Sequence, residues 1–306
     1  MILMVTQLLN GFQLGLLLFL LAAGLTLVFG IMDLVHLAHG SFYMIGAFLC
    51  AAISAATGSF LIGAALAIPL TFLAGVVVEA ATLRTLYTRH HLDHVLATFG
   101  LILFFDTAVH LVWGPGGLPV NLPSYLDGSI ELPGGVFIPT IRIVIIGVGL
   151  LVAAFLYALI TKTRMGMLIR AGASNRTMAG AMGVDIKRLF TLIFGLGSAL
   201  AGLAGIMAIA ITTEASIGMG TGIIIQSFVV IVIGGVGSIR GAFIAAIIVG
   251  MVDTLGRSYL DQFFKLFLSE QSAETAAPAI SAMSIYILMA AVLFFRPQGL
   301  FPPTAR

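Results

Sequence analysis

The chain has 306 residues, of which 60% are apolar and only 8% are charged. Soluble domains average about 45–50% apolar and about 25% charged residues, so this composition excludes an ordinary soluble protein and indicates an integral membrane protein. The formal net charge is only +2, and the basic residues gather in loops beside apolar runs, where they set orientation. Nucleic acid is therefore not expected as a partner.

Apolar runs long enough to span a membrane recur along the whole chain. A helix needs about 20 residues to cross about 30 Å of hydrocarbon. We expect an all-α, polytopic protein surrounded by membrane lipid, with residues 1–306 forming a single transmembrane domain. The first Lys or Arg is Arg84, so the first run lacks the basic start of a signal peptide and is expected to remain as a helix. About eight spans are predicted, at residues 8–31, 41–57, 60–83, 95–113, 141–161, 189–212, 223–256 and 280–295.

The basic loops predict the orientation of these spans. Residues 84–91 and 162–188 carry the loop Lys and Arg residues and are expected in the cytoplasm, because cytoplasmic loops are enriched in Lys and Arg. Residues 114–140 contain Asp127 and Glu131 without Lys or Arg before the next helix, and are expected outside. Within the first basic loop, Arg84 is expected to pair with Glu79 at the end of the third span.

The C-terminal segment 294–306 is also basic and is expected in the cytoplasm. With the N-terminus outside, eight complete crossings would leave the C-terminus outside as well. One predicted span must therefore be re-entrant or must cross twice.

The run 223–256 is too long for one helix and is interrupted by glycines around Arg240. We expect two segments that meet at a turn near 234–241. A similar interruption is predicted near 31–41, where Gly40 and Ser41 could start and cap a new helix. Transporters with broken helices carry paired interruptions of this kind, because a half-helix N-terminus inside the membrane offers free N–H groups to an anionic ligand. Glycines that only let helices pack closely are the alternative.

Candidate residues for a translocation path lie in and beside these interruptions. The spacing of Asp33, His36 and His39 leaves three interpretations: polar residues at a vestibule or membrane face, contacts to a substrate or gate, or ligands of a metal. The first is the simplest, and no metal is expected. The candidate path residues are Asp33, His36, His39, Gly40, Ser41, Phe42, Thr98, Gln226, Gly234, Gly235 and Ser238.

Catalytic motifs are absent from the sequence. It contains neither the G-x-x-x-x-G-K-[ST] phosphate-binding loop nor the H-E-x-x-H and G-x-S-x-G motifs. Its one cysteine, Cys50, lies in an apolar run, which excludes a disulfide framework within the chain. The chain is not expected to be an enzyme or to hold a cofactor.

The cytoplasmic loop 162–188 holds six of the fourteen Lys and Arg residues. A helix of about two turns is predicted from Asn175, capped by Ser174 and ended by Gly183. Such a short helix is marginal alone, so we expect a partner surface to stabilise it, with Met178, Ala179 and Met182 on one face. A loop that only sets topology would not need these caps. The expected coupling residues are Arg170, Ala171, Asn175, Arg176, Met178, Ala179 and Gly183.

These features resemble a known family. Ala179 and Gly183 fit the A-x-x-x-G core of the coupling motif of ABC importer permeases, although Thr177 and Met178 replace the usual Glu-Ala start. The permeases of branched-chain amino acid systems carry similar blocks, and the chain resembles the shorter of their two permease subunits. The resembling blocks are GLTLVFGIMDLVHLAHGSFYMIGAF, ATFGL, GMLIRAGASNRTMAGAMGV, FVVIVIGGVGSIRGAFIAAIIVG and LFFRPQGLF.

The resemblance implies a multi-pass protein of the bacterial inner membrane, working with a second permease subunit, two ABC ATPase subunits and a periplasmic substrate-binding protein. ATP and Mg²⁺ would be bound by the ATPase subunits. The implied substrate is a branched-chain or related amino acid or another small carboxylate, and the sequence does not distinguish these from amides, urea or aromatic acids. A stand-alone secondary transporter or channel, or an intramembrane metalloenzyme, remains an alternative.

Overall fold

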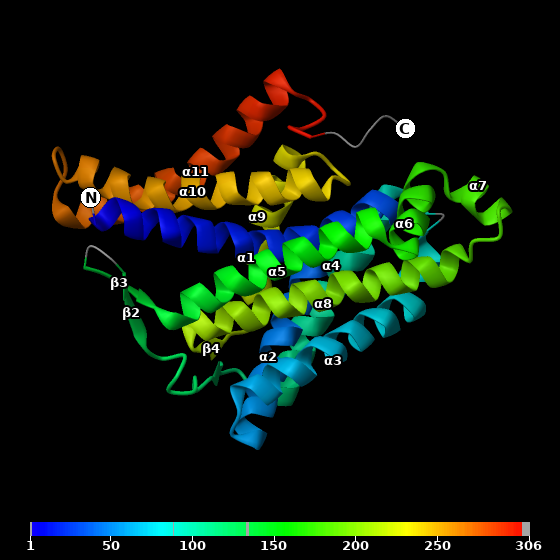
Figure 1. The fold of residues 1–306 in the computed structure, drawn as a ribbon, viewed down its shortest axis with the longest axis horizontal. Coiled ribbons are helices and arrows are strands. Elements are labelled where there is room, and N and C mark those ends of the chain that lie inside the picture. Colours follow the sequence, from blue (N-terminus) through cyan, green and yellow to red (C-terminus); the bar gives the residue numbers. More distant parts are fainter. Residues whose placement is uncertain (1, 88, 133–134, 302–306) are drawn as a thin grey trace.

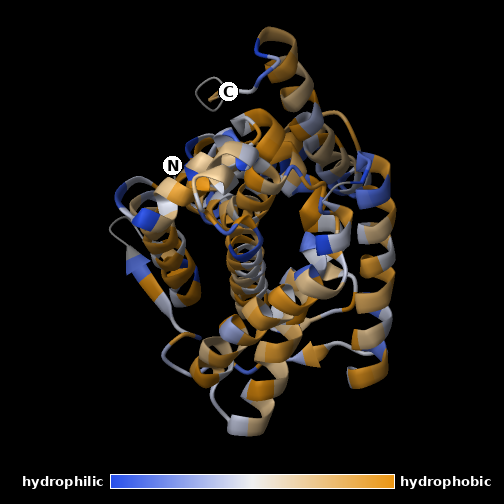
Figure 2. Cartoon of the chain, turned by 90° about the vertical axis from the view of Figure 1, so that its right-hand side faces the viewer, coloured by the Kyte–Doolittle hydropathy of each residue, from blue (hydrophilic) through white to orange (hydrophobic). Residues whose placement is uncertain are grey.

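The computed structural model describes residues 2–87, 89–132 and 135–301. Eight of its helices are long and apolar enough to cross a membrane, which confirms the predicted all-α polytopic fold. Viewed from one end, these helices are hydrophobic around most of their circumference (Figure 2). They are α1 (Ile2–Met32), α2 (His39–Thr57), α3 (Phe60–Ala81), α4 (His91–Trp113), α5 (Thr140–Lys162), α8 (Ile186–Thr212), α10 (Ile239–Phe264) and α11 (Glu270–Phe295).

Helix α1 forms the core of the bundle and packs against α5, α8 and α10. It is apolar on all sides, as expected for a helix buried among others rather than on a surface. Its glycines allow close approach, because a Cβ on Gly15 would lie 2.8 Å from the Cα of Ile247 in α10. Small residues commonly hold membrane helices together in this way.

The predicted break in the run 223–256 is confirmed. Helix α9 (Met219–Gly234) ends at the break, and α10 begins after it. Gly235 and Gly237 have φ angles of 103° and 84°, which favour glycine because a Cβ would be strained there. Ser238 caps α10, since its hydroxyl accepts a hydrogen bond from the N–H of Gly241 at 3.1 Å.

This break resolves the conflict in the predicted topology. Helix α9 is a ninth apolar helix within the described residues, and α10 runs back along α1 from the break. The C-terminal segment then meets the same break, where the N–H of Leu300 donates to Ile233 at 2.8 Å. The first and last described residues, 2 and 301, thus lie toward opposite ends of the bundle (Figure 1), and the single predicted span 223–256 supplies two apolar helices, α9 and α10.

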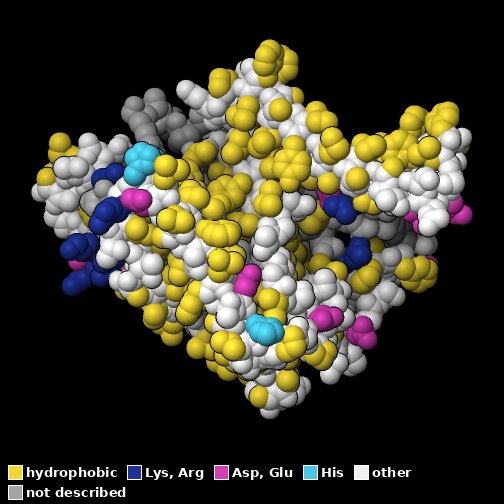
Figure 3. Space-filling model, turned by 180° about the vertical axis from the view of Figure 1, so that it is seen from behind, with side chains coloured by type: hydrophobic (Ala, Val, Ile, Leu, Met, Phe, Trp, Pro, Cys, Tyr) yellow, Lys and Arg dark blue, Asp and Glu magenta, His cyan; other side chains and the backbone are white. Residues whose placement is uncertain are grey.

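The two ends of the bundle differ in charge. Helices α6 (Arg164–Ser174) and α7 (Arg176–Ala181) lie at one end of the long axis, with the N-terminus, β2 and β3 at the other (Figure 1). Most visible Lys and Arg side chains gather at one end (Figure 3). By the positive-inside rule, the end with α6 and α7 is the inner end.

Short strands lie at the outer end. The hairpin of β2 (Ser129–Leu132) and β3 (Val136–Pro139) precedes α5, and β1 (Leu118–Pro119) pairs with β4 (Glu214–Ala215). This pairing places β4, which precedes α9, next to the loop that was predicted outside. Residues 133 and 134 of that loop, and residues 302–306 of the basic C-terminal segment, lie outside the described residues.

Several predicted helix starts were wrong, and the first of these helices, α1, begins at Ile2 rather than near residue 8. Helix α11 begins at Glu270 rather than near 280, because Ser269 caps it by accepting a hydrogen bond from the N–H of Ser272 at 3.4 Å. The predicted break near 31–41 exists, but Ser41 does not cap α2. That helix begins two residues earlier, at His39, after Ala38, which makes no side-chain cap.

Candidate functional site

The inner end carries a helical hairpin where the sequence predicted one short helix. Helix α6 spans eleven residues and was not predicted as a helix. Thr163 caps it, since its hydroxyl accepts a hydrogen bond from the N–H of Gly166 at 3.1 Å. This Thr, placed before an apolar pattern that includes the buried Ile169, is the signal that could have revealed α6.

Helix α7 confirms the predicted end of the short helix and corrects its start. Its cap is Asn175 rather than Ser174, because α6 continues through Ser174 and the Asn175 side chain accepts from the N–H of Met178 at 2.9 Å. At the other end, Gly183 has a φ of 90°. The N–H groups of Gly183 and Val184 donate to the carbonyls of Gly180 and Ala179, which is a Schellman motif.

The face of α7 differs from the one predicted. Met178 and Met182 are 61% and 81% exposed, whereas Ala179 is only 6% exposed and lies on the inward side. Beside Met182, a groove of about 320 Å³ runs between α6 and α8, with Leu168 and Leu189 among its apolar walls. Asp185 and Arg188 also line this groove, and two exposed methionines beside a mostly apolar groove form a surface suited to a protein partner.

A polar cluster lies at the inner ends of α3 and α8. The carboxylate of Glu79 is fully buried and forms the predicted ion pair with Arg84 at 3.0 Å. It also accepts hydrogen bonds from the hydroxyls of Tyr87 and of Thr191, the latter at 2.8 Å. Burial and the bond to Glu79 raise the pKa of Tyr87, so its hydroxyl remains a donor. This cluster joins α3 to the start of α8, directly after α7.

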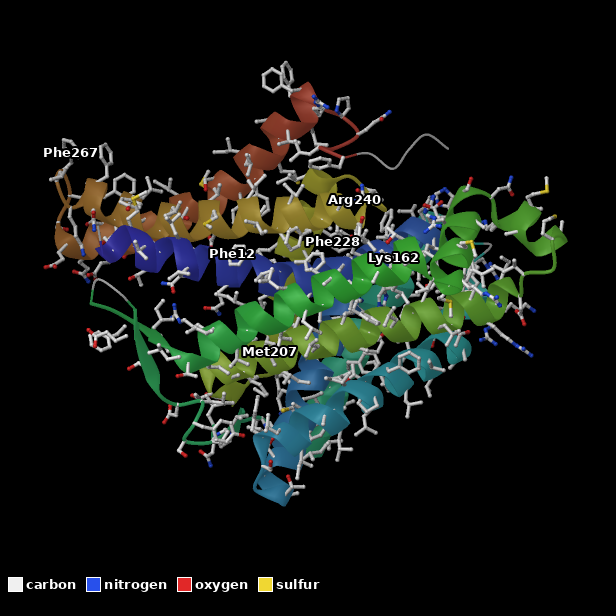
Figure 4. The ribbon with its side chains drawn as sticks, in the orientation of Figure 1. Phe12, Lys162, Met207, Phe228, Arg240 and Phe267 are labelled. Carbon is white, nitrogen blue, oxygen red and sulfur yellow. The ribbon has the colours of Figure 1, made fainter. Side chains whose placement is uncertain are left out.

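The hairpin and the helix break share a cavity. A cavity of about 530 Å³ between α1, α5, α6 and α10 is lined by Arg170 of α6 and by Ser238 and Arg240 at the start of α10. Arg240 lies over the ring of Tyr157, with 5.3 Å between the guanidinium carbon and the ring centre. Arg240 and Lys162 lie toward the inner end of the molecule, while Phe267 marks the outer end (Figure 4). The same cavity therefore contacts a predicted coupling residue and a predicted path residue.

The structure separates Asp33 from the two histidines. These three residues do not share a helix, because α1 ends at Met32 and Asp33 adopts a left-handed φ of 54°. Asp33 lines an inner cleft of about 510 Å³ together with Arg89 and Arg176. Within the described residues, no group of three or more His, Cys, Asp and Glu side chains is placed to hold a metal ion.

The histidines lie in the packed core. His36 and His39 are fully buried with ring centres 5.7 Å apart, and the ring of Phe42 lies 5.9 Å from that of His36. Thr98 is also fully buried, and its hydroxyl donates to the carbonyl of His94 at 2.7 Å. Gln226 is half-buried in α9 and lines neither the cavity at the α9–α10 break, nor the inner cleft, nor the groove beside Met182.

The glycine positions are closed by neighbouring backbone. Gly40 packs against Gly220 at the start of α9, and together with Ser41 they line a small cavity that also contacts Asp106 of α4. At the other break, a Cβ on Gly234 would lie 2.5 Å from the carbonyl carbon of Gly241. A Cβ on Gly235 would lie 2.9 Å from the carbonyl oxygen of Phe301, so the C-terminal segment covers this break.

The sequence matches a family model over residues 7–293, described as the permease component of branched-chain amino acid transport systems. The chain belongs to this family. The family is a transport component rather than an enzyme, and its model covers most of every membrane helix, the α6–α7 hairpin and both breaks. No solved structure matches the chain.

Curated relatives agree with this assignment. The permease is 31% identical over 274 residues to the high-affinity branched-chain amino acid transport system permease protein LivH of Escherichia coli K12, covering 85% of this chain and 88% of the relative. It is 29% identical to BraD of Pseudomonas aeruginosa, covering 96% and 94%. A more distant match, at 26% identity, is the ribose import permease protein RbsC of Escherichia coli K12.

Proposed function

We propose that this permease is a subunit of an ABC importer for branched-chain or related amino acids, or other small carboxylates, in the bacterial inner membrane. A second permease subunit would complete the translocation path, and a periplasmic substrate-binding protein would deliver the ligand. Two ABC ATPase subunits would bind ATP and Mg²⁺, with no cofactor in this chain. The names of the relatives support the substrate class, and family membership favours this function over a stand-alone transporter or channel.

The observation that carries the proposal is the capped hairpin at the inner end. Asn175 and Gly183 fix both ends of α7, and Met178 and Met182 are exposed. A six-residue helix does not hold its shape without caps or a partner. We infer that the ATPase receives α7 in a groove, with the methionines as its apolar contacts.

Arginines beside α7 would give this contact its charge. Arg176 is the first residue of α7 and Arg170 lies in α6, while the small side chains of Ala171 and of the inward-facing Ala179 allow close packing. Closure of the ATPase dimer on ATP would then move the hairpin, α8 and the cavity beside the α9–α10 break together. By such a shift between two packed states, binding at one site changes the conformation of the whole protein.

The experiment uses the double variant Met178→Asp, Met182→Asp in the complete complex. Both side chains are exposed, so the variant is expected to fold and insert normally but to lose co-purification with the ATPase. The control is Leu266→Asp, since Leu266 is 75% exposed at the outer end. Retention of the ATPase by the double variant would contradict the proposal, as would uptake by the purified permease in liposomes without any ATPase.

A further inference from the structure

The cavity between α1, α5, α6 and α10 has a length that fits one half of a bilayer. On α1 it extends from Ile31 near the inner end to Phe19, twelve residues deeper. This spacing corresponds to about 18 Å along a helix. Half of a hydrocarbon core is about 15 Å. The cavity therefore spans the depth of the inner leaflet and closes near its middle.

Its walls are apolar at the closed end. Phe19 of α1 and Phe243 of α10 meet edge to face there, with ring centres 5.1 Å apart. Ala153 of α5 also lines this cavity, and its small side chain leaves space there. Tyr157 and Ile244 on the walls are 49% and 37% exposed, so the cavity also opens sideways, toward the region that lipid occupies.

Its mouth is cationic. Arg170 and Arg240 line the inner end, and none of the described residues that line this cavity is acidic. The guanidinium of Arg170 donates to the carbonyl of Ile160 at the end of α5, and Arg240 lies over Tyr157, so both side chains are positioned without a carboxylate partner there. Basic pockets between membrane helices on the cytoplasmic side bind the head groups of anionic lipids.

A buried hydroxyl lies between the cationic and apolar parts. Thr26 lines the cavity, is 1% exposed, and its hydroxyl has no hydrogen-bond partner within the described residues. It lies four residues below Gly30, or about 6 Å along the axis of α1. Buried polar groups without partners are uncommon and require an explanation. A lipid ester carbonyl, which lies just below the phosphate, would accept this hydrogen bond.

We propose that this cavity binds one anionic phospholipid of the inner leaflet. Arg170 and Arg240 would hold the phosphate, Thr26 would donate to an ester carbonyl, and an acyl chain would lie along α5 and α10 as far as Phe19. The proposal does not depend on the identity of the transported substrate. Because Arg170 belongs to the hairpin and Ser238 to the helix break, the lipid would join these two segments.

The test is native mass spectrometry of the full chain after incubation with phosphatidylglycerol or with phosphatidylcholine of the same acyl composition. One phosphatidylglycerol is expected to be retained in preference to phosphatidylcholine. Arg240→Gln is expected to lower this retention about five-fold, since a cationic side chain near the membrane surface contributes about 1 kcal/mol. Arg164→Gln is the matched control. Arg164 is an exposed arginine of α6, the helix that also holds Arg170, and it does not line the cavity.

A second variant separates the acyl chain from the head group. Ala153→Trp fills the apolar part, keeps both arginines, and is expected to reduce phosphatidylglycerol retention while binding of free glycerol phosphate is unchanged. Equal retention of both lipids, or no effect of Arg240→Gln, would overturn the proposal. Competition by glycerol phosphate at the same concentration as the lipid would overturn it too. Cross-linking of Tyr157→Cys to the second permease subunit would assign the cavity to a protein helix instead.

Discussion

Gly30 and Gly237 meet where the inner end of α1 contacts the α9–α10 break. A Cβ on Gly30 would lie 2.7 Å from the Cα of Gly237, which is closer than real Cβ atoms approach a backbone carbon. The two backbones therefore touch without intervening side chains. This contact joins the central helix of the bundle to the turn that carries Ser238 and Arg240.

Gly30→Ala is expected to destabilise the permease by about 1–3 kcal/mol, because an added methyl group forces the two backbones apart. The measurement is thermal unfolding of the purified protein in detergent. Gly147→Ala in α5 is the control, since a Cβ at Gly147 meets no atom within 4 Å. Equal melting temperatures for the two variants would show that the contact with Gly237 is not as close as described.

Thr191→Val is expected to lower the free energy of unfolding by about 1–3 kcal/mol, because the buried carboxylate of Glu79 loses one of its donors. The shape of the side chain is nearly preserved, so the effect reports the hydroxyl. Thr57→Val is the control, since the Thr57 hydroxyl bonds only to backbone groups of its own segment, at Ile53 and Ser59, at an exposed helix end. If the Thr191→Val variant is as stable as the wild type, the hydrogen bond between Thr191 and Glu79 does not anchor α8 to α3.

Alkaline pH is expected to weaken the same cluster through Tyr87. Burial, followed by the bond to Glu79, raises the pKa of this phenol in the folded protein. Above about pH 10 the unfolded chain loses the Tyr87 proton while the folded protein keeps it, so stability falls as pH rises, by at most about 1.4 kcal/mol per pH unit. Tyr87→Phe should show a smaller fall in melting temperature over this range. An identical fall in both proteins would contradict the raised pKa.

Gly183→Val is expected to uncouple ATP hydrolysis from uptake while the protein still inserts into the membrane. The side chain strains a left-handed residue and disrupts the turn after α7. Gly58→Val is a matched control, because Gly58 has a φ of 70° at the end of α2 and also has open space around its Cβ. The two changes have similar local strain, so loss of coupling only in Gly183→Val would locate the effect in the hairpin. Normal uptake by Gly183→Val would argue against a coupling role.

Local signals in the sequence predicted much of this architecture. Apolar runs located the spans, the glycines around Arg240 located the α9–α10 break, and Gly183 located the end of α7. The start of α7 was missed by one residue, because Ser174 and Asn175 are both good caps and only the length of α6 decides between them. Helix α6 was missed because its charged residues suggested a loop.

Long-range contacts could not be predicted from the sequence. The spacing of Asp33 and His36 suggested a common face, but the left-handed conformation of Asp33 turns the chain and separates the two side chains. The packing of Gly40 against Gly220 depends on residues far apart in the chain, as does the covering of Gly235 by the C-terminal segment. The candidate path residues consequently fall into the core, an inner cleft and two separate cavities.

The central claim is that α7 contacts the ATPase subunit, and site-specific cross-linking tests it most directly. Cys50, the one cysteine of the chain, is buried, so Met182→Cys provides a single accessible thiol. In the assembled complex, a short thiol cross-linker is expected to join Met182→Cys to the ATPase. The control variant Leu268→Cys, at the outer end, is not expected to cross-link to the ATPase. If Met182→Cys also fails to cross-link to the ATPase, in a complex that still hydrolyses ATP and imports substrate, the account is contradicted.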